Sequence, residues 1–249
     1  MNRKIGMIGS LVNTFTVICF AVFLLIGYKI GYFFVCIFLS MSFMCMIAAF
    51  DVECKDDRKV AGRTALVLSG VYATLIMIVY FTQCTTVANE NLSPEVAGIL
   101  NFSNMGWIFN LDLLGYGIMA LSTFFAGLTI NAENKKDKAL KIMLMLHGLF
   151  FPGCLIMPMT GVFAGSTGST SIGGTIALEI WCLFFLPIGI LSYIHFAAHS
   201  PLTQLNSSKK RSLYRLLFTS TMRFERTTYR LGGGRSILLS YADLPVSVP

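Results

Sequence analysis

The stretch Ile5–Phe50 reads IGMIGSLVNTFTVICFAVFLLIGYKIGYFFVCIFLSMSFMCMIAAF, and it decides the fold. As one helix it would rise about 70 Å at 1.5 Å per residue, whereas the hydrocarbon core of a bilayer is about 30 Å thick. The stretch must therefore turn back, and the two glycines that flank Tyr28 and Lys29, Gly27 and Gly31, suit a tight hairpin. We expect two membrane-spanning helices here.

Four further apolar runs of spanning length follow, so the sequence predicts an all-α, polytopic transmembrane bundle. Hydrophobic residues make up 55% of the chain and charged residues 12%, about half the charged share usual in soluble domains. The predicted spans are Ile5–Gly27, Ile30–Phe50, Thr64–Cys84, Met105–Asn131, Ile142–Phe163 and Ile172–Ala198. Residues 1–200 form the helical domain, and residues 201–249 are expected to be a basic, disordered tail.

Basic residues lie almost entirely in every second connector. Arg3 and Lys4 precede the first span, and the connectors Asp51–Arg63 and Ala132–Lys141 carry four basic residues each. Together with the tail, these segments hold 18 of the 19 Lys and Arg residues, and only Lys29 lies on the opposite side. The positive-inside rule therefore predicts that both termini are cytoplasmic. In the longest outer connector, Ser93-Pro94-Glu95 predicts the start of a short helix that runs to about Leu100.

Two acids lie inside the predicted spans, Asp112 and Glu179. Each is seven residues from the start of its span, which places it about 10 Å below the outer end of its helix. No Lys or Arg occurs in any predicted span, so each acid must be protonated, be hydrated in a cavity or bind a cation.

Helical spacing groups polar residues into one stripe on the third span and one on the fourth, and the second of these stripes contains Asp112. One stripe of the fourth span holds Asp112, Gly115, Tyr116, Met119, Ser122, Thr123 and Ala126, and one of the third holds Ser69, Tyr72, Ala73, Ile76, Tyr80 and Gln83. Since the Phe- and Leu-rich sides should face lipid, both stripes are expected to face the bundle interior. We interpret Asp112, Glu179, Tyr116, Gln83 and Tyr80 as a substrate-binding pocket that opens outward. The alternative is that the two acids are hydrated and merely stabilise helix packing.

The histidines, the cysteines and the prolines of the predicted spans are given structural interpretations, without a catalytic or metal-binding role. The histidines near cytoplasmic span ends, His147, His195 and His199, are taken as interface residues. Three prolines should kink or interrupt their helices: Pro152, Pro158 and Pro187. There is no HExxH, no GxSxG, no phosphate-binding glycine loop and no Cys/His zinc spacing, so we expect no enzyme, metal or cofactor, and free thiols at all seven cysteines.

The tail differs in composition from the helical domain, because it uses Arg where the domain uses Lys. Its segments Thr227–Ile237 (TTYRLGGGRSI) and Leu239–Asp243 (LSYAD) resemble a peptide from reading frames that run through a transfer-RNA gene. The resemblance implies a frameshift or read-through end. The alternative is a genuine basic tail whose Lys209–Met222 segment lies on anionic lipid. In neither case does the tail's charge indicate nucleic-acid binding.

Two stretches of the third and fourth spans carry a second resemblance. Tyr80–Val87 (YFTQCTTV) and Leu111–Gly117 (LDLLGYG), continued by Leu121–Leu128 (LSTFFAGL), resemble an uncharacterised group of bacterial six-span membrane proteins. The resemblance implies a bacterial plasma-membrane location and transfers no activity. We expect a multi-pass protein that binds or transports a small solute or cation from the outer face. The alternative is a non-transporting sensor, or a subunit that docks on a membrane-protein partner.

The predicted topology can be tested with reporter fusions. Fusions after Lys55 and Lys136 should place the reporter in the cytoplasm, and fusions after Glu90 and Ser169 should place it outside, because the basic connectors remain inside. Alkaline phosphatase and a fluorescent protein fused at the same positions report the two sides. A C-terminal reporter found outside would contradict the six-span arrangement.

Overall fold

The computed structural model describes residues 1–198 except 90, 162 and 164–171. Every regular element in this part is helical, and all of them belong to one compact unit, Met1–Ser200. The tail from residue 201, with the read-through peptide predicted in it, lies outside the described residues, and so does His199.

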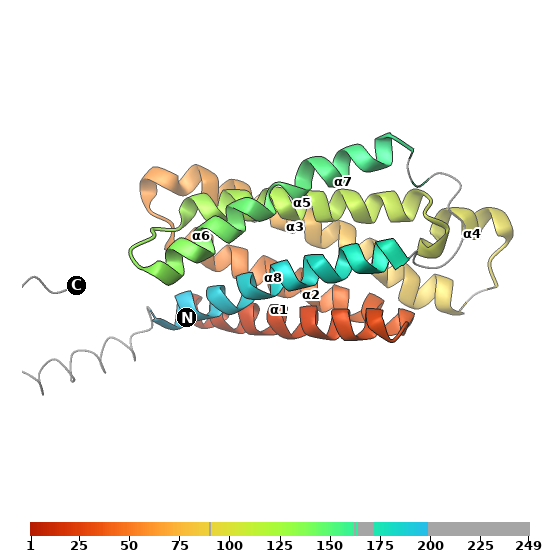
Figure 1. The fold of residues 1–249 in the computed structure, drawn as a ribbon, viewed down its shortest axis with the longest axis horizontal. Helices are drawn as coiled ribbons and strands as arrows, with labels where there is room; N and C mark the ends of the chain where they lie inside the picture. Colours follow the sequence, from red (N-terminus) through yellow and green to blue (C-terminus); the bar gives the residue numbers. More distant parts are fainter. Residues whose placement is uncertain (90, 162, 164–171, 199–249) are drawn as a thin grey trace, which may run out of the picture. The chain divides into compact units, whose positions relative to one another are not determined.

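The helical elements follow one another with short connectors (Figure 1). They are α1 (Asn2–Leu25), α2 (Lys29–Glu53), the 3₁₀ turn η1 (Asp56–Arg58), α3 (Lys59–Thr82), the π-helical turn η2 (Gln83–Val87), α4 (Pro94–Leu100), the 3₁₀ turn η3 (Phe102–Asn104), α5 (Trp107–Thr129), α6 (Lys135–His147), α7 (Phe150–Met159) and α8 (Ile172–Ala198). Within the described part, six segments are long and apolar enough to cross a membrane: α1, α2, α3 with its flanking turns, α5, α6 together with α7, and α8. The prediction of an all-α chain with six such segments is confirmed.

Two local predictions are also confirmed. The turn between α1 and α2 passes through Gly27, whose φ of +70° is a conformation that glycine adopts at no steric cost. The short helix α4 begins where the sequence predicted, because the Ser93 side chain accepts a hydrogen bond from the backbone N–H of Val96 at 3.5 Å.

The fifth predicted span, Ile142–Phe163, is wrong in its boundaries and is broken in the middle. Its helix starts seven residues earlier, at Lys135, because the Asn134 side chain caps it by accepting a hydrogen bond from the Asp137 N–H at 2.9 Å. It breaks between α6 and α7 at Gly148 and Leu149. Pro152 explains the break, since proline has no N–H and its ring clashes with the carbonyl four residues earlier.

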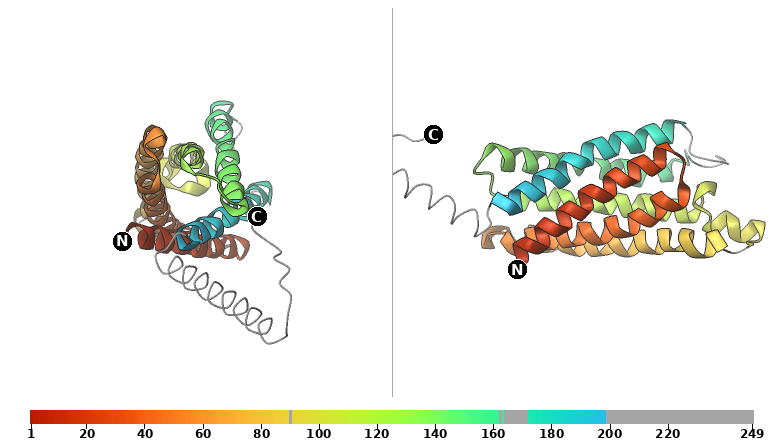
Figure 2. Two further views of the ribbon diagram at one scale, coloured as in Figure 1. Left: turned by 90° about the vertical axis from the view of Figure 1, so that its left-hand side faces the viewer. Right: turned by 90° about the horizontal axis from the view of Figure 1, so that it is seen from below.

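The helices form a ring, which Figure 2 shows end-on. Consecutive pairs pack together from α1 through α2 and α3 to α5, and the last helix, α8, packs on α1. Helix α6 packs on both α5 and α8 and so closes the ring. Helix α7 packs chiefly on α5, and none of its residues is buried.

The two ends of the bundle differ in charge. The end with the starts of α1, α3 and α6 and the end of α8, here called the basic end, holds the connectors rich in Lys and Arg. Lys29 lies at the opposite end, where its Nζ donates a hydrogen bond to Ser103 Oγ at 3.2 Å, next to α4. We call this the α4 end. The charge segregation fits the predicted topology, and the orientation relative to the cell remains a prediction.

The two predicted polar stripes face the interior. All six members of the α3–η2 stripe are buried, and so are those of α5 except the half-buried Tyr116. Helices α3 and α5 are in direct contact, since Ser122 Oγ of the α5 stripe donates a hydrogen bond to the Ala65 carbonyl oxygen of α3 at 2.8 Å. Aromatic rings fill the centre of the ring of helices, where Trp181 of α8 lies 5.5 Å from Tyr116 and 6.5 Å from Phe20 of α1, measured between ring centroids.

Close approach of α1 and α2 depends on Gly9, and this can be tested. A Cβ atom at Gly9 would lie 3.0 Å from the backbone nitrogen of Met46 and 3.1 Å from the carbonyl oxygen of Ser42, and backbone inside a helix cannot move aside. Gly9→Val should therefore destabilise the protein by about 1–3 kcal/mol. Gly70→Val is the matched control, because a Cβ at Gly70 meets nothing within 4 Å. Thermal unfolding in detergent measures both, and equal losses would contradict the packing argument.

Candidate functional site

Asp112 lies in the second turn of α5, towards the α4 end of the bundle. Only 5% of the residue is exposed, and its Oδ1 atom has no hydrogen-bond partner. The ion pairs of the described residues all lie at the basic end, and none of them involves Asp112. The carboxyl group is therefore buried without a cationic side chain beside it.

Three tyrosines and one cysteine lie near enough to this carboxyl group to interact with its charge. Tyr80 of α3, which is 3% exposed, interacts with Asp112 directly. Tyr72 of α3 and Tyr116 of α5 lie close enough to be affected by its charge. The Tyr116 hydroxyl also lies 3.7 Å from Cys36 Sγ of α2, while the Tyr72 hydroxyl has no hydrogen-bond partner. The structure thus brings together three of the five predicted pocket residues, Asp112, Tyr80 and Tyr116. We call these three, together with Tyr72 and Cys36, the Asp112 cluster.

Gln83 lies at the same end of the bundle but is engaged elsewhere. Its Nε2 donates a hydrogen bond to the Leu100 carbonyl oxygen at 2.8 Å, and its Oε1 accepts one from the Phe102 backbone N–H at 3.0 Å. The side chain is buried, with 2% of the residue exposed. It therefore fastens the connector between α4 and α5 to the end of α3.

Glu179 is not joined to Asp112 by any contact in the described part of the chain. It lies on α8, which packs on α1 and α6, whereas Asp112 lies on α5. Its charge affects the thiol of Cys182, one turn further along α8. Its Oε1 atom is buried without a partner. The site shared by the two acids therefore stays a prediction.

His147 was predicted to be an interface residue, and this is wrong. It is 1% exposed and lies inside the bundle, at the C-terminal end of α6. Trp181 Nε1 donates a hydrogen bond to His147 Nε2 at 3.0 Å, so that ring nitrogen carries no proton. The other nitrogen, Nδ1, lies 2.8 Å from Thr123 Oγ1, whose hydroxyl donates to the Ala120 carbonyl oxygen at 2.7 Å. Nδ1–H is therefore the donor, and a neutral histidine links α8, α6 and α5.

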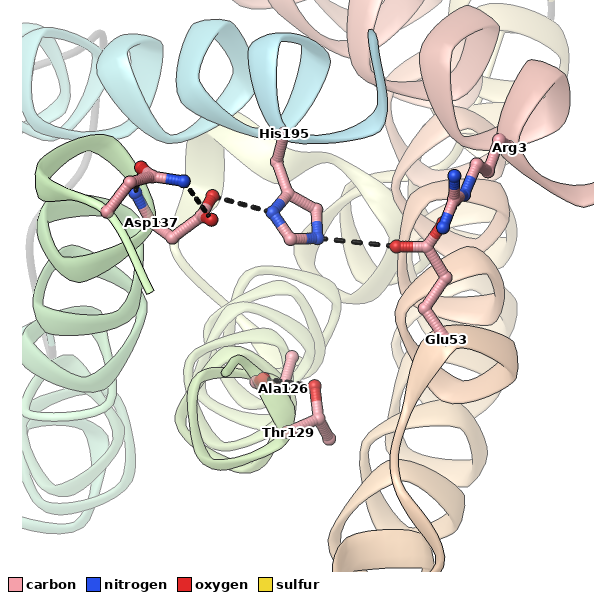
Figure 3. Close-up of polar contacts among 7 residues, drawn as sticks. Arg3, Glu53, Ala126, Thr129, Asp137 and His195 are labelled. Carbon is pink, nitrogen blue, oxygen red and sulfur yellow. Dashed lines mark hydrogen bonds and ion pairs between the residues drawn. The ribbon is translucent and has the colours of Figure 1, made fainter. Parts of the chain in front are cut away.

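His195 was also predicted to be an interface residue, and it lies instead inside an ion network at the basic end (Figure 3). Its Nδ1 lies 2.7 Å from Asp137 Oδ1 of α6, and its Nε2 lies 3.3 Å from Glu53 Oε2 of α2. Arg3 of α1 pairs with the same Glu53 carboxylate at 2.6 Å. The network ties four helices together and closes the ring between α6 and α8. Its members are far apart in the sequence, so no local pattern indicated it.

A shallow hollow lies beside the break between α6 and α7. Its volume is about 350 Å³, and its walls are Leu146, Leu149, Phe150 and Phe184. Because all four side chains are apolar, this hollow suits lipid chains and does not correspond to the predicted polar pocket.

The chemistry available at the Asp112 cluster is that of a carboxyl group, phenol hydroxyls and one thiol. These groups can bind and exchange a proton, and their oxygens suit a small cation. Within the described residues, no three His, Cys, Asp or Glu side chains gather as a metal site would require. No protein-family model matches the chain, and no curated protein or solved structure gives a significant match.

The bond between Trp181 and His147 should contribute measurably to stability. Trp181→Phe leaves His147 Nε2 as a buried acceptor without a donor, which should cost about 1–3 kcal/mol of unfolding free energy. Trp107→Phe is the matched control, since Trp107 is 58% exposed and is the only other tryptophan. Adding His147→Phe to Trp181→Phe removes both partners, so the double variant should lose less than the two single losses combined. Strictly additive losses in chemical unfolding would contradict the assignment.

Proposed function

We propose that this chain is a multi-pass protein of the bacterial plasma membrane that binds a proton or another small cation at Asp112. The basic end then faces the cytoplasm, and the ion enters from the α4 end. The proposal keeps the predicted outward-facing site at Asp112, Tyr80 and Tyr116. Gln83 becomes part of its entrance, and Glu179 has no part in it.

The observation that carries this proposal is the isolation of the Asp112 carboxyl group. It is buried, its Oδ1 has no hydrogen-bond partner, and no basic side chain within the described residues pairs with it. Transfer of an unpaired ionised carboxylate into an apolar interior costs many kcal/mol, so such groups are neutralised or bind a cation. A carboxyl group retained in such a place is typical of ion-binding membrane proteins.

The packing around the site supports a closed arrangement. Tyr72 and Tyr80, which lie near Asp112, are buried. A proton needs no cavity, and a dehydrated monovalent cation needs little room. Access from water requires a movement at the α4 end, and the ion is held while the site is shut.

The second candidate function is a non-transporting membrane module, such as a sensor or a subunit of a larger complex. The observation that favours it is the same close packing, since most polar side chains in the stripes are satisfied inside the bundle. Such a module would dock through the exposed lysines of the basic end, Lys55, Lys135, Lys136 and Lys138. A transporter moves ions across a membrane, and a module does not.

The leading proposal is tested by Asp112→Asn, which keeps the shape of the side chain and removes its proton-binding group. If Asp112 holds a proton, infrared spectra of the purified protein should show the carbonyl band of a buried carboxylic acid, and the variant should lose it. If Asp112 holds a cation, LiCl, NaCl or KCl should stabilise the protein over choline chloride, by about 2.7 kcal/mol at 100 times the dissociation constant. That stabilisation should disappear in the variant.

Glu95→Gln is the matched control, because Glu95 is an exposed acid at the same end of the bundle. It should leave the band and the salt response unchanged. Proteoliposomes that contain a pH-sensitive dye, driven by a potassium diffusion potential, separate the two functions: a transporter produces an Asp112-dependent signal and a module produces none. Absence of both the acid band and any cation effect would overturn the proposed ion site.

A further inference from the structure

The connector from Pro94 to Asn104 covers the α4 end of the bundle without being part of its core. Figures 1 and 2 both place α4 beyond the ends of the long helices. No residue of α4 or η3 is buried, in contrast to the long helices on either side. A segment with so little buried surface is expected to open at lower free energy than the helices beneath it.

One buried side chain fastens this connector to the bundle. Gln83 binds it at both ends of its amide group, donating to the Leu100 carbonyl oxygen and accepting from the Phe102 N–H, at 2.8 Å and 3.0 Å. The remaining polar contact to a long helix, from Lys29 to Ser103, is exposed to water. Gln83 also begins the π-helical turn η2, and such turns occur frequently at functional sites.

The ring of Phe102 fills the space between the connector and the Asp112 cluster. Its centroid lies 5.5 Å from that of Phe33 on α2, 6.2 Å from that of Tyr80 on α3 and 5.2 Å from that of Phe109 on α5. Tyr80 is the residue that interacts with Asp112. Phe102 thus lies at the junction of three helices, in ring contact with the tyrosine that interacts with Asp112.

The connector ends at a strained backbone position. Met105 has a φ of +50°, which is unfavourable for a residue with a side chain. The next residue, Gly106, approaches the Gly98 carbonyl oxygen so closely that no Cβ atom would fit. Strained backbone conformations are frequent at switch segments, where the packing of one state keeps the residue in its unfavourable conformation.

We infer that Pro94–Asn104 is a lid over the Asp112 cluster, with Gln83 as its latch and Phe102 as its plug. Release of the two Gln83 hydrogen bonds lets the lid turn about Met105, which withdraws Phe102 and opens Asp112 to water at the α4 end. The lid controls only the access of water to Asp112. This inference rests on the proposed function for one point, the identity of the ion that passes.

The test measures how fast Asp112 reacts with a water-soluble carbodiimide and glycine methyl ester. The full-length purified chain is labelled, then digested, and mass spectrometry of the peptide that contains Asp112 gives the rate. Gln83→Ala removes both latch bonds and should raise the rate at Asp112 about tenfold, which corresponds to about 1.4 kcal/mol in favour of the open lid. Phe102→Ala removes the plug and keeps its backbone N–H, so it should also raise the rate. Thr82→Ala is the matched control, since the Thr82 hydroxyl binds only the Ile78 carbonyl oxygen in its own helix.

Hydrogen–deuterium exchange of the same samples shows whether the lid moves alone. In Gln83→Ala, amides of 94–104 should exchange faster while those of α3 and α5 remain protected. Faster exchange throughout the bundle would show that Gln83 holds the fold together, which overturns the lid. An Asp112 rate unchanged in both Gln83→Ala and Phe102→Ala overturns it as well. Neither result depends on ion binding, so the lid and the proposed function fail independently.

Discussion

Inside a bundle of apolar helices every buried polar group must find its partner within the protein, and the arrangement of this bundle follows from that constraint. Most interior hydroxyls meet it locally: Ser10 and Thr14 donate hydrogen bonds to carbonyl oxygens four residues earlier in α1. His147 meets it across three helices, through Trp181 and Thr123. Asp112 Oδ1 is one of several buried polar atoms of the described residues that have no partner, as are Glu179 Oε1 and both polar atoms of the Asn13 amide. An unpaired buried carboxyl group is costlier to retain than an unpaired amide or hydroxyl, so Asp112 points to function.

The features that the sequence predicted well are those encoded by local patterns. Apolar length predicted the six spans, and spacing along each helix placed Tyr80 and Asp112 on interior stripes. The cap at Ser93 predicted α4, and Pro152 predicted a disturbed fifth helix, whose break lies one turn before the proline. Each of these depends on residues within a few turns of one another, where helix geometry alone relates sequence to space.

What the sequence could not provide is the choice of neighbours between helices. Equal depth suggested that Glu179 and Asp112 share a site, but depth alone says nothing about position around the ring, and α8 packs chiefly on α1 and α6. His195 meets Asp137 across 58 residues, and Gln83 meets Leu100 through a side chain whose polarity alone suggested a ligand contact. Such pairs depend on tertiary packing, which no single-helix pattern contains.

Closure of the ring by the last helix has a consequence for biosynthesis. The chain emerges from α1 onwards, so the α1–α2 hairpin can form early, with Gly27 at its turn. The partners of Trp181 and His195 must wait, because α8 is synthesised after all the other described helices. Until then the His147 ring lacks its donor, and the acids Glu53 and Asp137 lack their shared histidine. The nascent bundle therefore remains open on one side until α8 has been synthesised and has packed in place.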